Sequence, residues 1–283
     1  MKKKFSIAYC ERDGVHAVSS SFAYIYSAGY TGVSLAPAAG DISPALLSWV
    51  KDAGLCVESL YLPVDCINLL WHDSPALPLP ADALPTDDVA KDESTWEALF
   101  ALYSSFFAFA HSIRVEHAVL LPSVGEQLPP VSQKGIDRFR ALADEAQRQG
   151  VRLLFENDRS APHFEAVVRA CCRGYHGVCF FPAKAWRYFG SSALPRYAAQ
   201  SLLRVRLDDG SGDSFGCLPL DGDADLSPFV KSIAPLNFDG FLALSPDPSQ
   251  SLYTGEDAAE LAARGYDRLC DVLRLVQREA GAY

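Results

Sequence analysis

Eight short apolar runs recur along the chain, and the segments between them carry helical patterns. The runs are Phe5–Tyr9, Gly32–Ala36, Leu55–Tyr61, His117–Leu121, Val151–Glu156, Gly177–Phe181, Leu202–Leu207 and Gly240–Ser245. They are apolar nearly throughout and lack clean alternation, which is typical of parallel strands buried on both faces. Eight strand–helix alternations with no second compositional block favour one closed barrel. We therefore predict an α/β fold, a single (β/α)8 TIM barrel spanning residues 1–283.

The intervening segments are consistent with this fold. Apolar residues recur at a spacing of three to four through Ser132–Gln149 and again through the last helix, Asp257–Glu279. A doubly wound dinucleotide-binding sheet would instead carry Gly-x-Gly-x-x-Gly directly after its first strand, and no such motif is present. The nearest match, Gly210–Gly216, has the wrong spacing and precedes no apolar helix, so we predict a loop there.

Composition excludes several classes of partner and location. The chain has 25 Lys and Arg residues against 35 Asp and Glu residues, a net charge of −10. Phosphates would repel such a chain, so we expect no nucleic-acid partner. The longest uncharged stretch, Ala98–Ile113, is interrupted by polar residues and too short to span a membrane, so we predict a buried helix. Eight cysteines without a Cys-x-x-Cys pair are typical of buried thiols in a reducing compartment, and we expect a cytoplasmic protein.

One long irregular stretch, residues 63–93, is rich in proline and aspartate. Loops of this length inside a domain are usually functional lids or disordered insertions. It follows the third strand, so in a barrel it lies at the C-terminal ends of the strands, where barrel enzymes place their active sites. We predict a lid-like insertion whose Trp71 and His72 contact the substrate, with a solvated insertion as the alternative.

The ends of the predicted strands carry two unexpected charges. Glu156 ends the most apolar strand, so its carboxyl group is expected to be desolvated and either raised in pKa or paired with a cation. A purely structural ion pair with a neighbouring strand is the alternative. Arg204 and Arg206 alternate on one face of their strand, with Leu203, Val205 and Leu207 on the other. An arginine inside a small barrel needs a carboxylate or an anionic ligand.

Six segments together carry a resemblance to a known family. They are 28–35, 150–157, 177–184, 202–209, 218–222 and 238–245, among them Gly-Val-Arg-Leu-Leu-Phe-Glu-Asn ending at Asn157. In this order and spacing the chain resembles the xylose-isomerase-like barrel superfamily, the sugar phosphate isomerase/epimerase group, over roughly residues 5–280. The resemblance implies a TIM barrel and an isomerase or epimerase activity in carbohydrate metabolism.

The resemblance also implies a metal site, which this chain has largely lost. Active members hold one divalent ion with a Glu, an Asp, a His and a second Glu at strand ends, and the two glutamates move a proton beside a carbonyl group. Glu156 matches the first glutamate, whereas Phe181, Arg206 and Ser245 stand where the other three ligands are expected. One carboxylate cannot hold a divalent ion tightly. We therefore predict a degenerate site with no metal and no other cofactor.

Three functions remain open from the sequence. The first is a metal-independent isomerase acting on a small sugar-like or carbonyl substrate, with Glu156 as the base and with Lys184 and Arg206 replacing the charge of the metal. The second is a non-catalytic barrel that binds a sugar, carboxylate or phosphate, or that serves in a larger assembly; an oligomer is possible in either case. The third is a metal enzyme with ligands relocated to the insertion, drawn from Asp65, His72 or Asp73.

The predicted charges also suggest a ligand class. Lys184 and Arg206 facing Glu156 alone would leave one positive charge unpaired, and an unpaired buried charge is costly. An anionic ligand would neutralise it, so we expect small anions such as sugar phosphates or sugar acids to bind better than neutral sugars. Asp209 is expected to contact the substrate, and the alternative is that Asp209 or an aspartate of the insertion neutralises the surplus internally.

Overall fold

Eight parallel strands close into a barrel in the computed structural model, which describes residues 4–9, 19–36, 42–72, 92–212, 214–247, 251–253 and 257–281. The strands are β1 (Phe5–Tyr9), β2 (Gly32–Leu35), β3 (Cys56–Tyr61), β4 (His117–Leu120), β5 (Arg152–Glu156), β6 (Gly177–Phe180), β7 (Leu202–Arg206) and β10 (Phe241–Leu244). They follow one another around the barrel in chain order, and β10 pairs with β1 to close it. This confirms the predicted (β/α)8 barrel, each strand lying within a residue or two of its predicted bounds.

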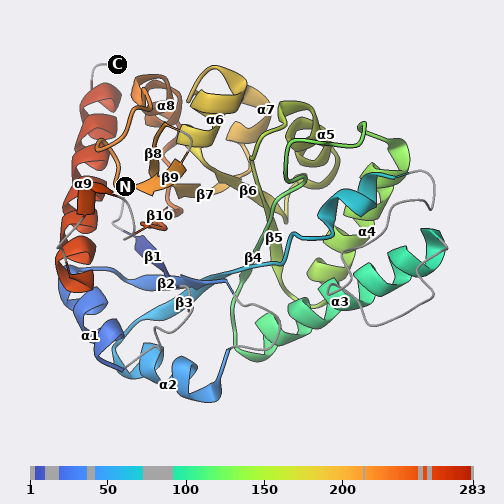
Figure 1. Ribbon diagram of the computed structural model, residues 1–283, viewed down its shortest axis with the longest axis horizontal. Coiled ribbons are helices and arrows are strands. Elements are labelled where there is room, and N and C mark those ends of the chain that lie inside the picture. Colours follow the sequence, from blue (N-terminus) through green and yellow to red (C-terminus); the bar gives the residue numbers. More distant parts are fainter. Residues whose placement is uncertain are drawn as a thin grey trace.

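Helices surround the strands (Figure 1). The α-helices are α1 (Ser19–Ala28), α2 (Pro44–Asp52), α3 (Asp92–Ser112), α4 (Gln133–Arg148), α5 (Ala161–Cys171), α6 (Pro182–Phe189), α7 (Arg196–Ala199), α8 (Ser227–Ile233) and α9 (Ala258–Ala280). Short 3-10 helices are η1 (Ile67–Trp71), η2 (Ala234–Leu236) and η3 (Ser251–Tyr253). The first and last helices, α1 and α9, pack side by side and so complete the outer ring.

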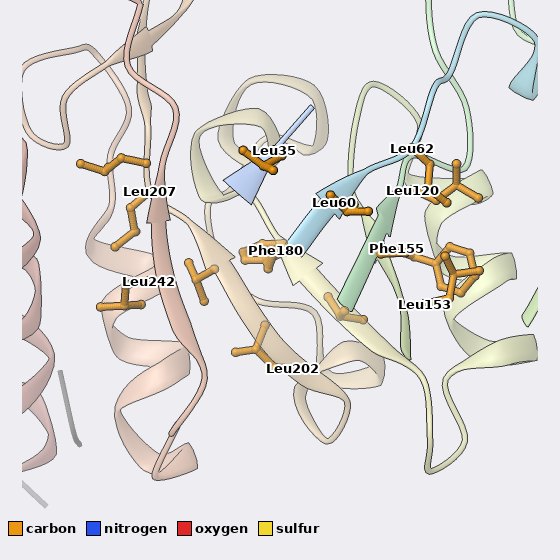
Figure 2. Packing of buried hydrophobic residues seen from close by; sticks show 14 of the residues in the cluster. Leu35, Leu60, Leu62, Leu120, Leu153, Phe155, Phe180, Leu202, Leu207 and Leu242 are labelled. Atoms are coloured by element: carbon orange, nitrogen blue, oxygen red, sulfur yellow. The ribbon is translucent and has the colours of Figure 1, made fainter. Parts of the chain in front are cut away.

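The main core lies between the outer faces of the strands and the helices. Figure 2 shows Leu60, Phe155 and Phe180 among the buried side chains of this cluster. Phe155 and Phe180 are fully buried, and each such side chain stabilises the fold by about 1.5–3 kcal/mol relative to an exposed one. A smaller apolar cluster, centred on Val119 and Leu154, fills part of the barrel interior. The polar side chains described below lie in the same interior.

Two irregularities in the strand register decide which side chains face inward. Val33 and Ser34 pair with Val57 and Ser59, which leaves Glu58 as an extra residue in β3. Val178 and Cys179 pair with Leu202 and Arg204, which leaves Leu203 as an extra residue in β7. Such bulges re-aim side chains.

The bulge in β7 corrects the predicted alternation of that strand. Arg204 and Arg206 do share the inner side, but Leu203 packs against the interior cluster and not with Val205 and Leu207 on the outside. Strict period-two alternation fails here because the extra residue shifts the strand by one position.

The segment Gly210–Gly216, predicted to be a loop, contains an antiparallel hairpin of β8 (Asp209–Ser211) and β9 (Ser214–Cys217). The Asp209 carboxylate holds it in place by accepting hydrogen bonds from the backbone N–H groups of Gly210, Gly222 and Ala224 at 2.7, 3.2 and 3.1 Å. A Cβ atom at Gly222 would lie 2.3 Å from the carbonyl oxygen of Gly210, so only glycine fits there. The prediction was wrong because this hairpin is stabilised by a side chain and not by an alternating apolar pattern.

Of the predicted insertion, the structure describes Pro63–His72, which contains η1, and Asp92–Glu93, which begin α3. Residues 73–91, including Asp73, lie outside the described residues. The stretch Ala98–Ile113 is helical, as predicted, and lies almost entirely within α3. Within the described ranges, none of the helices has both the length and the apolar character required to cross a membrane.

Candidate functional site

Glu156 ends β5 and points into the barrel, where it is fully buried. Its Oε2 atom accepts hydrogen bonds from the Tyr61 hydroxyl at 2.7 Å and from the Cys179 thiol at 3.3 Å. Its Oε1 atom accepts none from any described residue, and its nearest cation is Arg206, whose Nη1 lies 3.6 Å away. One oxygen of this carboxylate is therefore held by two hydrogen bonds, and the other is buried and faces the Arg206 guanidinium.

The surroundings of Glu156 keep it ionised. Burial alone would raise its pKa, but the charges of Arg206 and Lys184, with the hydrogen bond from Tyr61, outweigh burial and lower the pKa below its ordinary value of 4.5. Burial raises the pKa of Tyr61 well above 10.0, so its hydroxyl stays protonated and continues to donate. The sequence left open whether Glu156 would be raised in pKa or paired, and the geometry selects the paired, ionised state.

Arg206, the last residue of β7, lies against Glu156 on one side and Asp208 on the other. Its Nε atom donates to Asp208, and its guanidinium group stacks over the Phe181 ring with Cζ 4.7 Å from the ring centroid. Burial lowers the pKa of Arg206, but the neighbouring charges, Asp208 foremost, raise it further, so the side chain stays cationic. The sequence analysis did not assign Asp208 to the site. It is 1% exposed and also accepts the backbone N–H of Ser245.

Lys184 reaches the site from the first turn of α6. Its Nζ lies 2.6 Å from Oδ1 of Asp158, which follows β5, and 5.4 Å from the centroid of the Phe181 ring. The ends of β5 and β6 are fixed to each other because the Asn157 side chain exchanges two hydrogen bonds with the backbone of Phe181, at 2.9 and 2.7 Å. Lys184 and Arg206 thus both lie over the Phe181 ring, and Asp158 is a partner of Lys184 that the sequence analysis missed.

A second polar layer lies below Glu156. Arg204 donates from Nε to Oε1 of Glu58 at 2.8 Å and from Nη1 to the Tyr61 hydroxyl at 2.7 Å. Since Tyr61 donates to Glu156, a continuous chain runs from Glu58 through Arg204 and Tyr61 to Glu156. The sequence analysis did not assign Glu58 or Tyr61 to the site. A carboxylate inside an otherwise apolar strand was the available signal for Glu58.

The other three predicted contact residues lie apart from this group. Trp71 is 1% exposed, donates its indole N–H to the carbonyl oxygen of Pro122 at 2.7 Å and packs against Phe139. His72 offers its backbone carbonyl to Arg138 at 3.1 Å. In the described part of the chain, neither these two residues nor Asp209 contacts Glu156, Lys184 or Arg206 by a hydrogen bond or ion pair. Trp71 and Asp209 are buried, and backbone groups satisfy the hydrogen bonds of their polar atoms. Both side chains therefore stabilise the fold.

The positive surplus expected around Glu156 is not found among the described residues. Lys184 is paired with Asp158, and Arg206 is paired with Asp208 as well as facing Glu156. The carboxylates of the two layers are Glu58, Glu156, Asp158 and Asp208, and the cations are Lys184, Arg204 and Arg206. The prediction overlooked the carboxylates of Glu58, Asp158 and Asp208. The unpaired positive charge that was its reason for preferring anionic ligands is therefore not present among these residues.

The donor set around Glu156 does not fit a divalent cation. Across the described ranges, no group of three or more His, Cys, Asp or Glu side chains is arranged to hold a metal ion. The Oε1 atom of Glu156 faces the Arg206 guanidinium, which also lies over the ring of Phe181, the residue that stands where the family's aspartate ligand is expected. A guanidinium group beside the carboxylate repels a cation, so the described residues around Glu156 disfavour a bound divalent ion.

Comparison with known proteins places this geometry on a recognised scaffold. No family model and no curated protein matches the sequence. Among solved structures, a xylose isomerase domain protein from Planctomyces limnophilus matches with a TM-score of 0.65 and 14% identity, covering 99% of each chain. The IOLI protein with a binding zinc atom matches with a TM-score of 0.67 and 15% identity, covering 94% of this chain and 97% of that one.

A third match extends the set to an enzyme with a sugar bound. D-allulose 3-epimerase from Methylomonas sp. in complex with D-allulose has a TM-score of 0.66 and 13% identity, covering 95% of this chain and 98% of that one. Sequence identities this low establish similarity of the fold only. The chain therefore has the xylose isomerase-like TIM barrel fold, and the resemblance read from the sequence is confirmed at that level.

Proposed function

We propose that this barrel is an isomerase that moves a proton beside the carbonyl group of a small sugar-like substrate, with Glu156 as the base. The observation that carries the proposal is the Oε1 atom of Glu156, which belongs to a buried, ionised carboxylate and has no hydrogen-bond donor among the described residues. A general base needs an ionised carboxylate with an oxygen that no hydrogen bond occupies. Its position at a strand end agrees with the location of active sites in barrels.

The proposed step uses two cations in place of a metal. Glu156 Oε1 takes the proton from the carbon next to the carbonyl, the C–H electron pair forms the C=C bond of an enediolate, and the carbonyl π electrons move to oxygen. Arg206 and Lys184 stabilise the oxyanion electrostatically. Glu156 then returns the proton to the former carbonyl carbon, and protons move between the two oxygens. The low pKa of Glu156 makes it a weak base, so stabilisation of the enediolate has to supply much of the rate enhancement.

A single base also limits the stereochemistry. Inversion at a carbon requires proton removal on one face and delivery on the other. By the family resemblance, Ser245 stands where the second glutamate is expected, and Asp208 beside it is engaged by Arg206 and the Ser245 backbone. We therefore propose isomerisation in which Glu156 serves one face of the substrate, and not epimerisation.

The charge balance favours a neutral substrate. Each site cation already has a carboxylate partner, so a phosphate group would have to displace one of them. A neutral polyol can instead donate a hydroxyl to Glu156 Oε1 and accept from Arg206. Titration of D-fructose and D-fructose 6-phosphate into wild type and Arg206→Ala tests this. Tighter binding of the phosphate, lost in Arg206→Ala, would restore the anionic ligand class expected from the sequence.

Hydrogen–deuterium exchange tests the activity itself. Neutral aldoses and ketoses, including D-allulose and D-fructose, are incubated with the protein and EDTA in D2O, and loss of the C–H signal beside the carbonyl is followed by NMR. We expect exchange with wild type and a loss of roughly 100-fold or more in Glu156→Gln. The matched control is Glu165→Gln on α5, whose partner is the exposed Arg169, and it should exchange like wild type.

Two outcomes would contradict the proposal. Equal exchange by wild type and Glu156→Gln would remove Glu156 as the base. Sugar binding without any exchange would favour the non-catalytic binding barrel.

A cytoplasmic location, the absence of a nucleic-acid partner and the possible oligomer rest on the sequence and stay predictions.

A further inference from the structure

Two neutral donors meet at one oxygen of Glu156. The Tyr61 hydroxyl and the Cys179 thiol both donate to Oε2, at 2.7 and 3.3 Å. Tyr61 ends β3 and Cys179 lies in β6, so the two donors reach the carboxylate from different strands. The other oxygen, Oε1, accepts no hydrogen bond from any residue that the structure describes. Tyr61 and Cys179 take no part in the proton transfer proposed above.

Arg204 lies behind both donors. Its Nη1 atom donates to the hydroxyl oxygen of Tyr61 at 2.7 Å and to Sγ of Cys179 at 3.2 Å. A guanidinium group offers donors and no acceptor, so neither the hydroxyl nor the thiol can direct its hydrogen back to Arg204. Within the described part of the chain, the acceptor that lies within hydrogen-bond distance of both is Oε2 of Glu156. Arg204 therefore orients both hydrogens onto that oxygen.

Arg204 is itself held in one orientation. Its side chain is 1% exposed. Its Nε atom donates to Oε1 of Glu58 at 2.8 Å, and its Nη2 atom donates to Oγ of Ser34 at 3.3 Å. Because a guanidinium group is planar, fixing Nε and Nη2 also fixes the direction of Nη1. Nη1 is thereby aimed at Tyr61 and Cys179.

The protonation states of these groups agree with this arrangement. Burial raises the pKa of Tyr61 well above 10.0 and the pKa of the Cys179 thiol above 9.0, so both keep their hydrogens at neutral pH. Burial lowers the pKa of Arg204, but the neighbouring groups, Glu58 foremost, raise it well above 12.5. One cation and two neutral donors therefore surround Oε2 throughout the pH range in which an enzyme of this kind is assayed.

We propose that Arg204, Tyr61 and Cys179 are positioning residues that hold Oε2 of Glu156 and so select Oε1 as the oxygen that exchanges a proton. A carboxylate oxygen has two lone pairs, and two donors engage both of those on Oε2. Two donors on different strands also fix the plane of the carboxyl group. Oε1 is left facing Arg206, the cation assigned to the oxyanion. The role of Oε1 rests on the proposed function, whereas the hold on Oε2 does not.

Infrared spectroscopy tests the hold on Oε2 without any substrate. The S–H stretching band of a buried thiol moves to lower frequency as its hydrogen bond strengthens, and Cys179→Ala identifies the band of Cys179. We expect Glu156→Gln to move this band to higher frequency, because a neutral amide is a weaker acceptor than a carboxylate. The band of Cys172, whose thiol donates to the carbonyl oxygen of Gly177 at 3.2 Å, is the control and should not move. A Cys179 band that stays in place in Glu156→Gln would overturn the proposal.

The role of Arg204 needs a variant that does not leave a buried charge unpaired. Glu58→Leu with Arg204→Met removes the guanidinium group together with its charge partner. The Cys179 hydrogen is then no longer restricted to one direction, so its S–H band should broaden or split. Circular dichroism establishes that the variant is folded. An unchanged Cys179 band in the folded variant would remove Arg204 from the proposal.

The pH profile of deuterium exchange tests the consequence for the reaction. Tyr61→Phe removes a hydrogen bond to the ionised carboxylate, so the acid limb of the turnover rate should move up by about one pH unit, with KM unchanged. Cys179→Ala should move it in the same direction, and Cys179→Ser, which keeps a donor, should restore it. The matched control is Tyr103→Phe, which removes a buried hydroxyl that donates to the carbonyl oxygen of Pro63 at 2.9 Å and should leave the limb in place.

The two proposals fail separately. An acid limb that does not move in Tyr61→Phe, while Glu156→Gln abolishes exchange, would overturn the positioning role and leave the proposed function intact. A Cys179 band that moves in Glu156→Gln, without exchange in wild type, would establish the hold on Oε2 and remove the proposed reaction.

Discussion

Arg204 and Glu58 form an ion pair in the interior of the barrel, with Nε and Oε1 2.8 Å apart and both side chains at most 1% exposed. Oε1 of Glu58 also accepts hydrogen bonds from the hydroxyl groups of Ser6 and Ser59 at 2.9 and 3.0 Å. The pair lies in β7 and β3, on strands that are not neighbours in the barrel. It therefore ties the two sides of the barrel together from within.

We predict that Glu58→Gln destabilises the fold by about 3–5 kcal/mol, because it leaves Arg204 buried and without its charge partner. Replacing both residues, as Glu58→Leu with Arg204→Met, should recover most of this loss. Urea unfolding measures both. The exposed pair Lys4–Asp239 is the control, and Asp239→Asn should change stability little. A Glu58→Gln protein as stable as wild type would contradict the prediction.

We predict that the purified protein contains no stoichiometric metal ion at the Glu156 site, since Phe181 and Arg206 stand where ligands would be needed. Elemental analysis by mass spectrometry measures this, before and after incubation with zinc, manganese and cobalt. A content near one ion per chain that is lost in Glu156→Gln would show that residues elsewhere in the chain complete a site.

Glu145 on α4 makes part of the stability depend on pH. Hydrogen bonds from Arg148 at 2.7 and 2.8 Å, supported by Ser104 and Gln149 and opposed by burial, lower the pKa of Glu145 from 4.5 to about 2. A carboxyl whose pKa is lower in the folded state stabilises the fold above its unfolded value and loses this effect as pH falls through the folded value. The contribution is complete above pH 4.5 and lost by about pH 2.

We therefore predict that Glu145→Gln lowers the free energy of unfolding at pH 7 and that the difference from wild type shrinks as pH falls below 4.5. Denaturant titrations at a series of pH values measure this. A difference of the same size at pH 3 and pH 7 would mean that the lowered pKa of Glu145 contributes nothing to stability.

Gly135 in α4 is constrained by Trp71. A Cβ atom at this position would lie 2.3 Å from Cε3 of the indole ring. Alanine normally stabilises a helix relative to glycine by about 1 kcal/mol, but here we predict that Gly135→Ala destabilises by about 1–3 kcal/mol through overpacking. The double variant Trp71→Leu, Gly135→Ala should show strong positive coupling, measured by a double-mutant cycle. Additive effects would mean that the two residues do not touch.

The barrel was predictable because its signal is local. Each strand is a short apolar run and each helix has a 3.6-residue period, and neither depends on distant residues. The bulges at Glu58 and Leu203 and the β8–β9 hairpin were missed because they arise from cross-strand register and from one buried carboxylate. No sequence period marks such features.

The site was predictable only in part for the same reason. Glu156, Lys184 and Arg206 could be proposed from the sequence because strand ends and family resemblance point to them. Their partners Asp158 and Asp208 were not assigned to the site, since pairing is decided by distances between segments far apart in the chain. Trp71 was predicted to contact the substrate because an aromatic residue in a long loop resembles a binding residue. In the structure its side chain is buried and belongs to the core.

The hairpin anchored by Asp209 carries its own anion. Three backbone N–H groups gathered around a carboxylate resemble an anion-binding loop whose anion is part of the chain itself. The conformation of this loop therefore does not depend on an ion taken from solution.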